Sequence, residues 1–406
     1  MAAKVFQGGT AGGNWNNNAN WVGGAFAVAG DTVTFTGSNP CIVNVASACT
    51  SIDFTGWSNT FTITNAITLT VAGNVTLSST MTYATSTGIL AISSTATIIT
   101  NGKSIGSTLN FTGAGVTYTI GGGFDCTVLG LLGSSVGTYI IVNSATTEKI
   151  YASGSINISC GGSSIGWGGT APIIANGSGQ IYGTGTGTFF STSLTINTSG
   201  SYQLGGSSST YTLGVGFGGS LIYTAGTISY YGSATNIITY QGGNATISLN
   251  GLTIPTMNLT MTGTYTLTLN APLTVTAVNF SGNGGNGTFT IGGSYGFTFG
   301  SVTTNGATNL GGIVLTYGNT YVINTSFTWI NYTASGNIPT IKSSSAGNKV
   351  SLTLANGASC ALMGVKFTDV DASNGRTITT FNGTVSNTSN IISFNDLGTC
   401  VSGCAN

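Results

Sequence analysis

Histidine is absent from this chain of 406 residues, and charged side chains are scarce, with seven Lys or Arg and seven Asp or Glu. An average soluble protein is about a quarter charged, whereas the share here is 3%. Without histidine there can be no Ser-His-Asp triad, Cys-His dyad, HExxH zinc site or imidazole pH switch. We therefore expect neither a metal centre nor a cofactor.

The shortage of cations excludes further classes of protein. Seven basic residues spread over the chain cannot form the footprint that neutralises several phosphates, so we expect no nucleic-acid binding. Every apolar stretch is broken by Gly, Ser, Thr or Asn before it reaches the ~20 residues of a spanning helix, so we expect no membrane insertion. Residues 1–9 hold one positive charge and no apolar core, unlike a secretory signal peptide.

The residues that are abundant favour β-structure. Apolar residues alternate with threonine, and on two blocks of the chain they occupy odd-numbered positions only: Phe61, Ile63, Ile67, Leu69, Val71, Val75 and Leu77, then Met257, Leu259, Met261, Tyr265, Leu267, Leu269, Leu273 and Val275. A period of two places these side chains on one face of extended chain. Gly, Asn and Ser supply the turns. Helical periodicity is essentially absent, and the chain is predicted to be all-β.

Uniform composition over about 300 residues favours one stacked solenoid over a chain of separate sandwiches. We predict a right-handed parallel β-helix (β-solenoid) with coils of ~20–25 residues and capped ends. Residues 1–30, rich in Trp, Asn and Gly, are predicted to form an attachment or capping segment, and residues 31–335 the solenoid body. Residues 336–406 hold half of the charges and are predicted to form a C-terminal cap or small β-rich module.

The seven cysteines leave at least one without a partner in the chain. Small buried fillers are the favoured interpretation. The alternative is one or two local disulfides, Cys41–Cys49 and Cys400–Cys404, which are the closest pairs in the sequence.

Two acids are the best candidates for catalysis. Asp369 and Asp371 at i and i+2 would share one strand face at ~6–7 Å, a separation suited to glycoside cleavage. The favoured interpretation of the segment Asp369 to Gly375, which includes Asn374, is a structural turn, with Arg376 close enough to pair with a carboxylate. A cation site formed by Asp369, Asp371 and Asn374 is the other alternative.

Aromatic residues offer contacts to sugars or protein partners, since their rings stack and abundant Asn, Ser and Thr give neutral hydrogen bonds. Trp15, Trp21 and Trp57 are the candidates chosen for such contacts, although a solenoid also buries tryptophan in its core and caps. Thr-x-Thr repeats raise an ice-binding alternative, which needs the pair in register on nearly every coil. Their spacing is irregular.

The opening Gly13-Asn14-Trp15 with Asn20-Trp21, then Ala29 to Phe35, resembles β-helical proteins of bacteriophage virions and, in pattern, autotransporter-like surface proteins. The stretch Asn258 to Thr264 and the endings Ile341 to Gly347 and Phe367 to Ser373 are similar to the same group. The resemblance implies an extended β-helix on a particle surface and no catalytic residues.

We therefore expect a non-enzymatic structural protein of a virion surface, either a capsid decoration or fibre or a tail-fibre component. It would be made in the host cytoplasm and released by lysis, which fits the lack of a signal peptide. Its expected partners are other virion proteins, further copies of itself, with a trimer favoured, and a cell-surface glycan. The alternatives are a host-glycan adhesin or depolymerase tailspike, and an ice-binding solenoid.

Overall fold

The computed structural model describes residues 2–9, 12–113, 115–133, 140–143, 150–160, 173–184, 193–204, 213–215, 220–230, 238–241, 244–249, 252–261, 263–282, 287–304, 310–330 and 339–394. It divides into two compact units, which are described separately. Unit 1 comprises Met1–Leu213 and Thr224–Tyr231, and unit 2 comprises Gly214–Tyr223 and Gly232–Asn406. Strands β21 (Leu213–Val215) and β22 (Ser220–Tyr230) have residues in both units.

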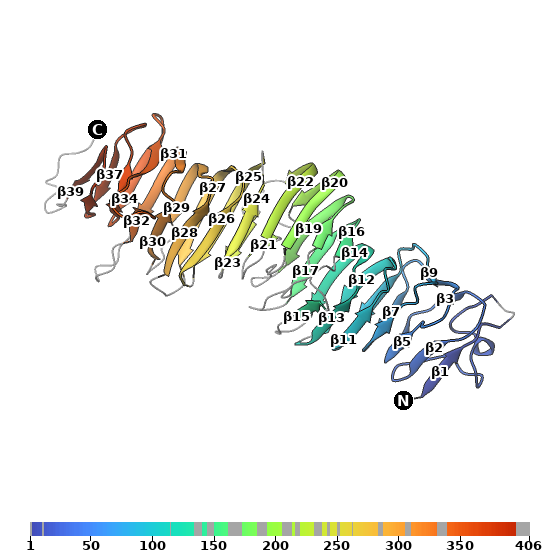
Figure 1. Cartoon of the computed structure of the whole chain (residues 1–406). Helices are drawn as coiled ribbons and strands as arrows, with labels where there is room; N and C mark the ends of the chain where they lie inside the picture. The colour runs from blue at the N-terminus through green and yellow to red at the C-terminus, as the bar shows by residue number, and fades with distance from the viewer. Residues whose placement is uncertain are drawn as a thin grey trace, which may run out of the picture. The chain divides into compact units, whose positions relative to one another are not determined.

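Unit 1 stacks its strands in three parallel sheets (Figure 1). The first runs β1 (Ala3–Phe6), β2 (Thr32–Phe35), β5 (Ser51–Asp53), β8 (Val75–Thr76), β11 (Ala96–Ile99), β13 (Thr117–Gly121), β15 (Ile140–Asn143). The second is β3 (Cys41–Val43), β6 (Thr60–Ile63), β9 (Thr82–Tyr83). The third runs β4 (Ser47–Cys49), β7 (Thr68–Val71), β10 (Ile89–Ile92), β12 (Ile105–Phe111), β14 (Phe124–Gly133), and continues through β16 (Ile150–Ala152), β17 (Ile156–Cys160), β18 (Ile173–Ala175), β19 (Gly179–Thr184) and β20 (Ser193–Leu204).

Unit 2 has two long parallel sheets. One runs β24 (Ala245–Ser248), β26 (Tyr265–Leu269), β28 (Gly287–Gly293), β30 (Leu310–Leu315), β32 (Thr340–Ser343), β35 (Lys366–Thr368), β38 (Val385–Ser386). The other runs β23 (Ile238–Gln241), β25 (Thr253–Met261), β27 (Leu273–Gly282), β29 (Phe297–Thr304), β31 (Thr320–Ile330), and continues through β33 (Val350–Leu354), β34 (Ser359–Met363), β36 (Val370–Asp371), β37 (Ile378–Phe381) and β39 (Ile391–Phe394).

Each strand pairs with the equivalent strand of the next coil, which is the defining feature of a solenoid. In unit 1, Ile52, Val75 and Ile98 pair in succession, 23 residues apart. In unit 2, Tyr265 pairs with Phe289, 24 residues further on. The predicted all-β fold with parallel stacked coils is confirmed. Among the described residues the one helical element is the 3₁₀ turn η1 (Asn18–Asn20).

The core lies inside the coils, because the period-two pattern directs alternate side chains inward. Most of the odd-numbered apolar residues of both blocks are buried, and Ile67 and Tyr265 are partly exposed exceptions. Register then aligns buried residues into columns, as with Leu69, Leu90 and Leu109 on β7, β10 and β12. Stacking of this kind buries apolar area along the whole sheet. It also fixes the register, because a slip of one residue would move the buried apolar side chains of a strand to its solvent-facing side.

Candidate functional site

Turns of successive coils in unit 2 meet at one corner and are joined by hydrogen bonds. We call them the corner row: residues 293–296, 316–319, 344–349 and 369. The Asn319 amide nitrogen donates to the carbonyl oxygens of Gly293 and Tyr295, at 3.1 Å each. Further along, the main-chain N–H of Tyr317 donates to Ser344 Oγ at 2.9 Å. The row is therefore one connected surface across several coils.

Two glycines bring the first turn of the row into close contact with its neighbours. Gly293 has φ +91°, and a Cβ there would lie 2.2 Å from the carbonyl oxygen of Leu269. A Cβ on Gly296 would lie 1.8 Å from the carbonyl oxygen of Thr320. Neither position has room for a side chain, so glycine there allows the turn to pack directly against the backbone of the preceding and following coils.

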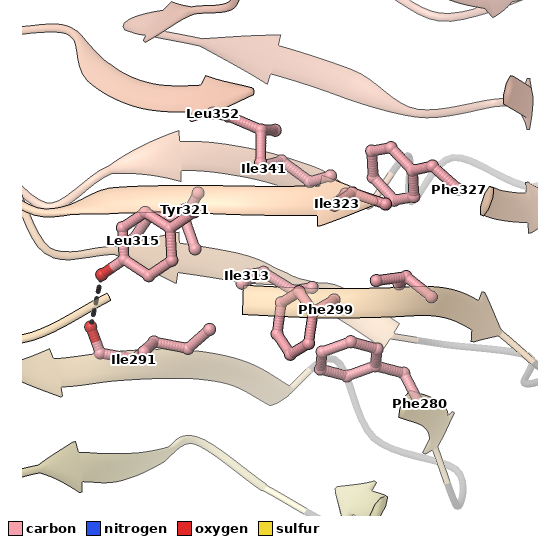
Figure 2. A pocket seen from close by; sticks show the side chains of 11 residues that line it. Phe280, Ile291, Phe299, Ile313, Leu315, Tyr321, Ile323, Phe327, Ile341 and Leu352 are labelled. Atoms are coloured by element: carbon pink, nitrogen blue, oxygen red, sulfur yellow. Dashed lines mark hydrogen bonds between the residues drawn. The ribbon is translucent and has the colours of Figure 1, made fainter. Parts of the chain in front are cut away.

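The second turn is anchored from below by a buried tyrosine. The N–H of Thr316 donates to the Tyr321 hydroxyl at 3.0 Å, and that hydroxyl faces the carbonyl oxygen of Ile291 at 3.4 Å. Figure 2 shows this contact beside the aliphatic and aromatic side chains of the core. Burial raises the pKa of Tyr321, because the charged form is disfavoured away from water. Tyr321 therefore stays a neutral structural anchor at neutral pH.

The row exposes two tyrosines. Tyr295 is 41% exposed and Tyr317 is 51% exposed, whereas Tyr118, Tyr202 and Tyr321 are fully buried. Sequence reasoning missed both residues, because it considered the tryptophans individually and the tyrosines only as a group. The available signal was local: each tyrosine precedes a glycine in a short turn, Ser-Tyr-Gly and Thr-Tyr-Gly, where no strand pattern directs it inward.

Asp369 closes the row. It is buried, has φ 55°, and accepts hydrogen bonds from the Gly347 N–H at 3.0 Å and the Asn387 amide at 2.6 Å. These two bonds, the Asn387 bond foremost, hold the pKa of Asp369 below its ordinary value, and the positive charge of Lys349 adds to them. N–H donors thus point at both carboxylate oxygens, so Asp369 ties the row to the next coil.

The expected pairing of Asp369 with Asp371 on one regular strand face is wrong. The left-handed φ of Asp369 interrupts the chain between β35 and β36, so the two acids do not occupy equivalent positions of one strand. Asp371 instead accepts the N–H of Ser373 at 2.9 Å, an Asx turn, and these contacts with Ser373 lower the pKa of Asp371. Asn374 is exposed in that turn.

Arg376 does not fulfil the expected role of carboxylate partner. Its guanidinium donates to the carbonyl oxygen of Ala358. The contacts of the segment from Asp369 to Arg376 are those of a structural turn. Within the described residues, no three His, Cys, Asp or Glu side chains gather where they could hold a metal ion.

Trp15 and Trp21 lie in a cap over the first coil. Trp15 is 0% and Trp21 1% exposed, and their rings pack edge to face with centroids 4.8 Å apart. The indole N–H of Trp21 donates to the carbonyl oxygen of Trp15 at 2.7 Å. Val22 N–H donates to the carbonyl oxygen of Val5, so this segment covers the open edge of β1. Rings enclosed in this way cannot present a face to a sugar, and the glycan-contact interpretation of these two residues is wrong.

Trp57 is one of the residues that line a groove in unit 1 of about 450 Å³. Its lining consists of two aromatic residues, Phe35 and Trp57, and six small residues: Thr36, Gly37, Ser38, Thr55, Gly56 and Ser58. The Trp57 side chain is only 2% exposed and packs at a tilt against Phe35 and Phe54 in an aromatic cluster. The Trp57 side chain is therefore almost entirely covered by its neighbours, although the residue lines the groove, and its contact role stays a prediction.

Two of the cysteines for which a local disulfide was the alternative are free and buried. Cys41 lies on β3 and Cys49 on β4, in different sheets, and both point into the core. The 41–49 bond is therefore not formed, and both residues serve as the small apolar fillers of the favoured interpretation. Cys400 and Cys404 lie outside the described residues.

Columns of threonine in unit 2 end after two or three coils. On one sheet Thr253, Thr274 and Thr298 pair in succession and Val322 follows. Thr266 pairs with Thr290, but the next positions are Val314 and Lys342. An ice-binding face needs the hydroxyl pair on nearly every coil, and these columns lack it.

No protein-family model, curated protein or solved structure matches the chain. In the described part of the chain there is no helix with the length and apolar character to cross a membrane.

Proposed function

We propose that the chain is a non-enzymatic structural protein of a bacteriophage virion surface, a capsid decoration or fibre or a tail-fibre component, with an adhesive role. The sequence resemblance of its ends and middle to phage β-helices supports the virion setting. The structural role is supported chiefly by the hydrogen bonds that polar side chains form between neighbouring coils. These bonds favour one register of each coil on the next.

Several turns repeat the same device. The side-chain oxygens of Asn65, Asn74 and Asn244 accept the N–H of Thr87, Thr97 and Thr266, which lie 22 or 23 residues later. Each bond satisfies a strand-entry donor of the next coil and favours one register. Amide pairs on facing strands add to it, since Asn279 donates to Asn258 at 3.0 Å. Such a body suits a scaffold.

Location is tested by immunogold electron microscopy of purified virions with antibodies raised against the full chain. We expect labelling on the head or tail surface. Absence of label from all particles, with the protein recovered free in the lysate, would overturn the virion proposal. Sedimentation equilibrium of the full chain tests the expected trimer, and a monomer at micromolar concentration would contradict it.

The depolymerase alternative is tested by release of reducing sugar from host surface polysaccharide. We expect no release by the full chain. Release that is lost in Asp369→Ala or Asp371→Ala would overturn the non-enzymatic proposal. Asp53→Ala is the matched control, because Asp53 makes the same kind of Asx turn, accepting the Thr55 N–H at 2.8 Å, at a different place in the fold.

A further inference from the structure

We infer that the exposed pair Tyr295 and Tyr317 on the corner row of unit 2 is a binding site for a neutral saccharide. The inference rests on the adhesive part of the proposed function and gives it a site and a ligand class. Four aromatic side chains are exposed among those that the structure describes: Tyr295, Tyr317, Phe381 and Phe394. The two phenylalanines stack on each other, with centroids 5.7 Å apart. Of these four exposed rings, only those of the two tyrosines carry a polar group, the phenolic hydroxyl.

The two rings come from adjacent coils at one corner. Ile291 pairs with Leu315, and the two turns follow directly from these residues. Asn319, in the turn of Tyr317, donates to the carbonyl oxygen of Tyr295 at 3.1 Å. Stacked parallel strands are ~4.8 Å apart, so the turns that carry the two tyrosines lie on neighbouring coils at a spacing that suits consecutive units of a sugar chain.

The site is held in place before any ligand arrives. The first turn packs closely against both neighbouring coils at Gly293 and Gly296 and accepts two hydrogen bonds from Asn319. The second turn is bonded to the buried hydroxyl of Tyr321 and to Ser344 Oγ. A ligand that binds to rigid turns avoids the cost of ordering them. Two exposed aromatic rings on fixed backbone are thus a prearranged platform.

The two turns that carry Tyr295 and Tyr317 favour a neutral, amphipathic ligand, and the charged residues of the row, Lys349 and Asp369, lie outside these two turns. The turns Gly-Ser-Tyr-Gly and Thr-Tyr-Gly-Asn contain no ionisable group besides the tyrosine phenols, so there is no charge to attract an acidic ligand. A tyrosine ring offers an apolar face with a hydroxyl at its edge. The C–H face of a hexose can lie on such a ring while its hydroxyls reach the neutral hydrogen-bonding groups of the turns.

The test uses the full chain on a printed array of neutral hexose and N-acetylhexosamine oligosaccharides, with sialylated and sulfated oligosaccharides as charged probes. We expect retention of at least one neutral oligosaccharide and none of the charged probes. The best neutral oligosaccharide is then titrated by calorimetry. Tyr295→Ala with Tyr317→Ala should weaken its binding on the order of tenfold or more, because both stacking surfaces are lost.

Phe394→Ala is the matched control, since it removes an aromatic ring of similar exposure from the same unit, and it should bind as the unmodified chain does. Tyr317→Phe keeps the ring and should retain most of the affinity. Unchanged binding in the double variant, or retention of charged probes alone, overturns the inference. Immunogold labelling is independent of sugar binding, so failure on the array leaves the virion proposal standing and the two failures are distinguishable.

Discussion

The hydroxyl of Tyr118 donates a hydrogen bond to the carbonyl oxygen of Ile92, 26 residues earlier in the chain, at 3.1 Å. The same hydroxyl accepts the N–H of Gly113 at 2.9 Å, so one buried phenol links a turn to the preceding coil. Tyr321 makes the equivalent pair of contacts in unit 2 with Ile291 and Thr316. Buried tyrosine hydroxyls thus satisfy main-chain groups at corners where the β-ladder stops.

The first prediction concerns this contact. Tyr118→Phe removes both hydrogen bonds and leaves the Gly113 N–H without its acceptor, whereas the Ile92 carbonyl oxygen keeps the Thr112 N–H as a donor at 2.8 Å. We expect the free energy of unfolding to fall by about 1–3 kcal/mol, measured by urea denaturation. Tyr317→Phe is the control, because its ring is exposed, and it should change stability by less than about 0.5 kcal/mol. Equal effects of the two substitutions would contradict the assigned role of the Tyr118 hydroxyl.

Two buried tryptophans give a second prediction with a built-in comparison. The indole N–H of Trp21 donates to Trp15, whereas the buried indole N–H of Trp57 has no hydrogen-bond partner. Trp21→Phe and Trp57→Phe delete the same atoms. We expect Trp21→Phe to destabilise the chain more, by about 1 kcal/mol, because only it breaks a hydrogen bond. Chemical denaturation of both variants measures the difference. The reverse order would show that the hydrogen bond from Trp21 to Trp15 does not stabilise the fold.

Sequence patterning predicted the fold because it rests on a property of the backbone itself. Phe61, Ile63, Leu69 and Val71 alternate with threonine, so in extended chain all four must lie on the same face. All four are in the core. Parallel stacking was not contained in the pattern of any one strand. It was inferred from the uniform composition of the chain, which favours one stacked solenoid over a series of separate domains.

The site was less predictable, because it depends on turns. The left-handed φ of Asp369, which separates it from Asp371, is a tertiary outcome of its bonds with Gly347 and Asn387. Exposure of Tyr295 depends in turn on which residues of the neighbouring coil approach Gly293 and Gly296. A single sequence without a legible repeat does not show which turns lie side by side.

The third prediction concerns pH. Asp369 has a lowered pKa in the folded chain, chiefly through its bond with Asn387, and Asp31 has a lowered pKa through the N–H groups of Ala2 and Val28. A carboxyl with a lowered folded pKa stabilises the fold above its ordinary pKa, and that stability is lost as pH falls through the folded value. The ordinary value is 3.8, so stability should decline below about pH 4.

At alkaline pH, groups whose pKa is raised in the folded chain lower its stability as pH rises. Burial raises the pKa of Cys49 and of Tyr230 to about 12, so the unfolded chain loses protons first and stability should fall above about pH 9. Between pH 5 and 8 we expect a flat melting temperature, since histidine is absent. Asp369→Asn should flatten part of the acid decline in calorimetric scans. A melting temperature that varies steeply near neutrality would contradict this account.

The fourth prediction concerns the thiols. Cys41, Cys49 and Cys126 are buried, and desolvation raises the pKa of each. A thiol that is both inaccessible and protonated reacts slowly with alkylating reagents. We expect iodoacetamide at pH 8 to modify Cys360 before these three in the folded chain, and to modify all four in urea. Peptide mass spectrometry would also reveal a Cys41–Cys49 disulfide, whose presence would contradict the fold of β3 and β4.

The last prediction concerns a small void in the core of unit 2, lined by Phe280, Phe299, Val302, Ile313 and Phe327 among other apolar side chains (Figure 2). Its volume is about 30 Å³ and its exposed lining is entirely apolar, so water gains no hydrogen bond there. Val302→Ile adds one methylene to the lining of this void and should raise the free energy of unfolding by about 0.5–1 kcal/mol. Val28→Ile, on an exposed side chain, serves as the control and should be neutral. Destabilisation by Val302→Ile in urea titrations would mean that the core at this level is already filled and that the extra methylene strains the neighbouring coils.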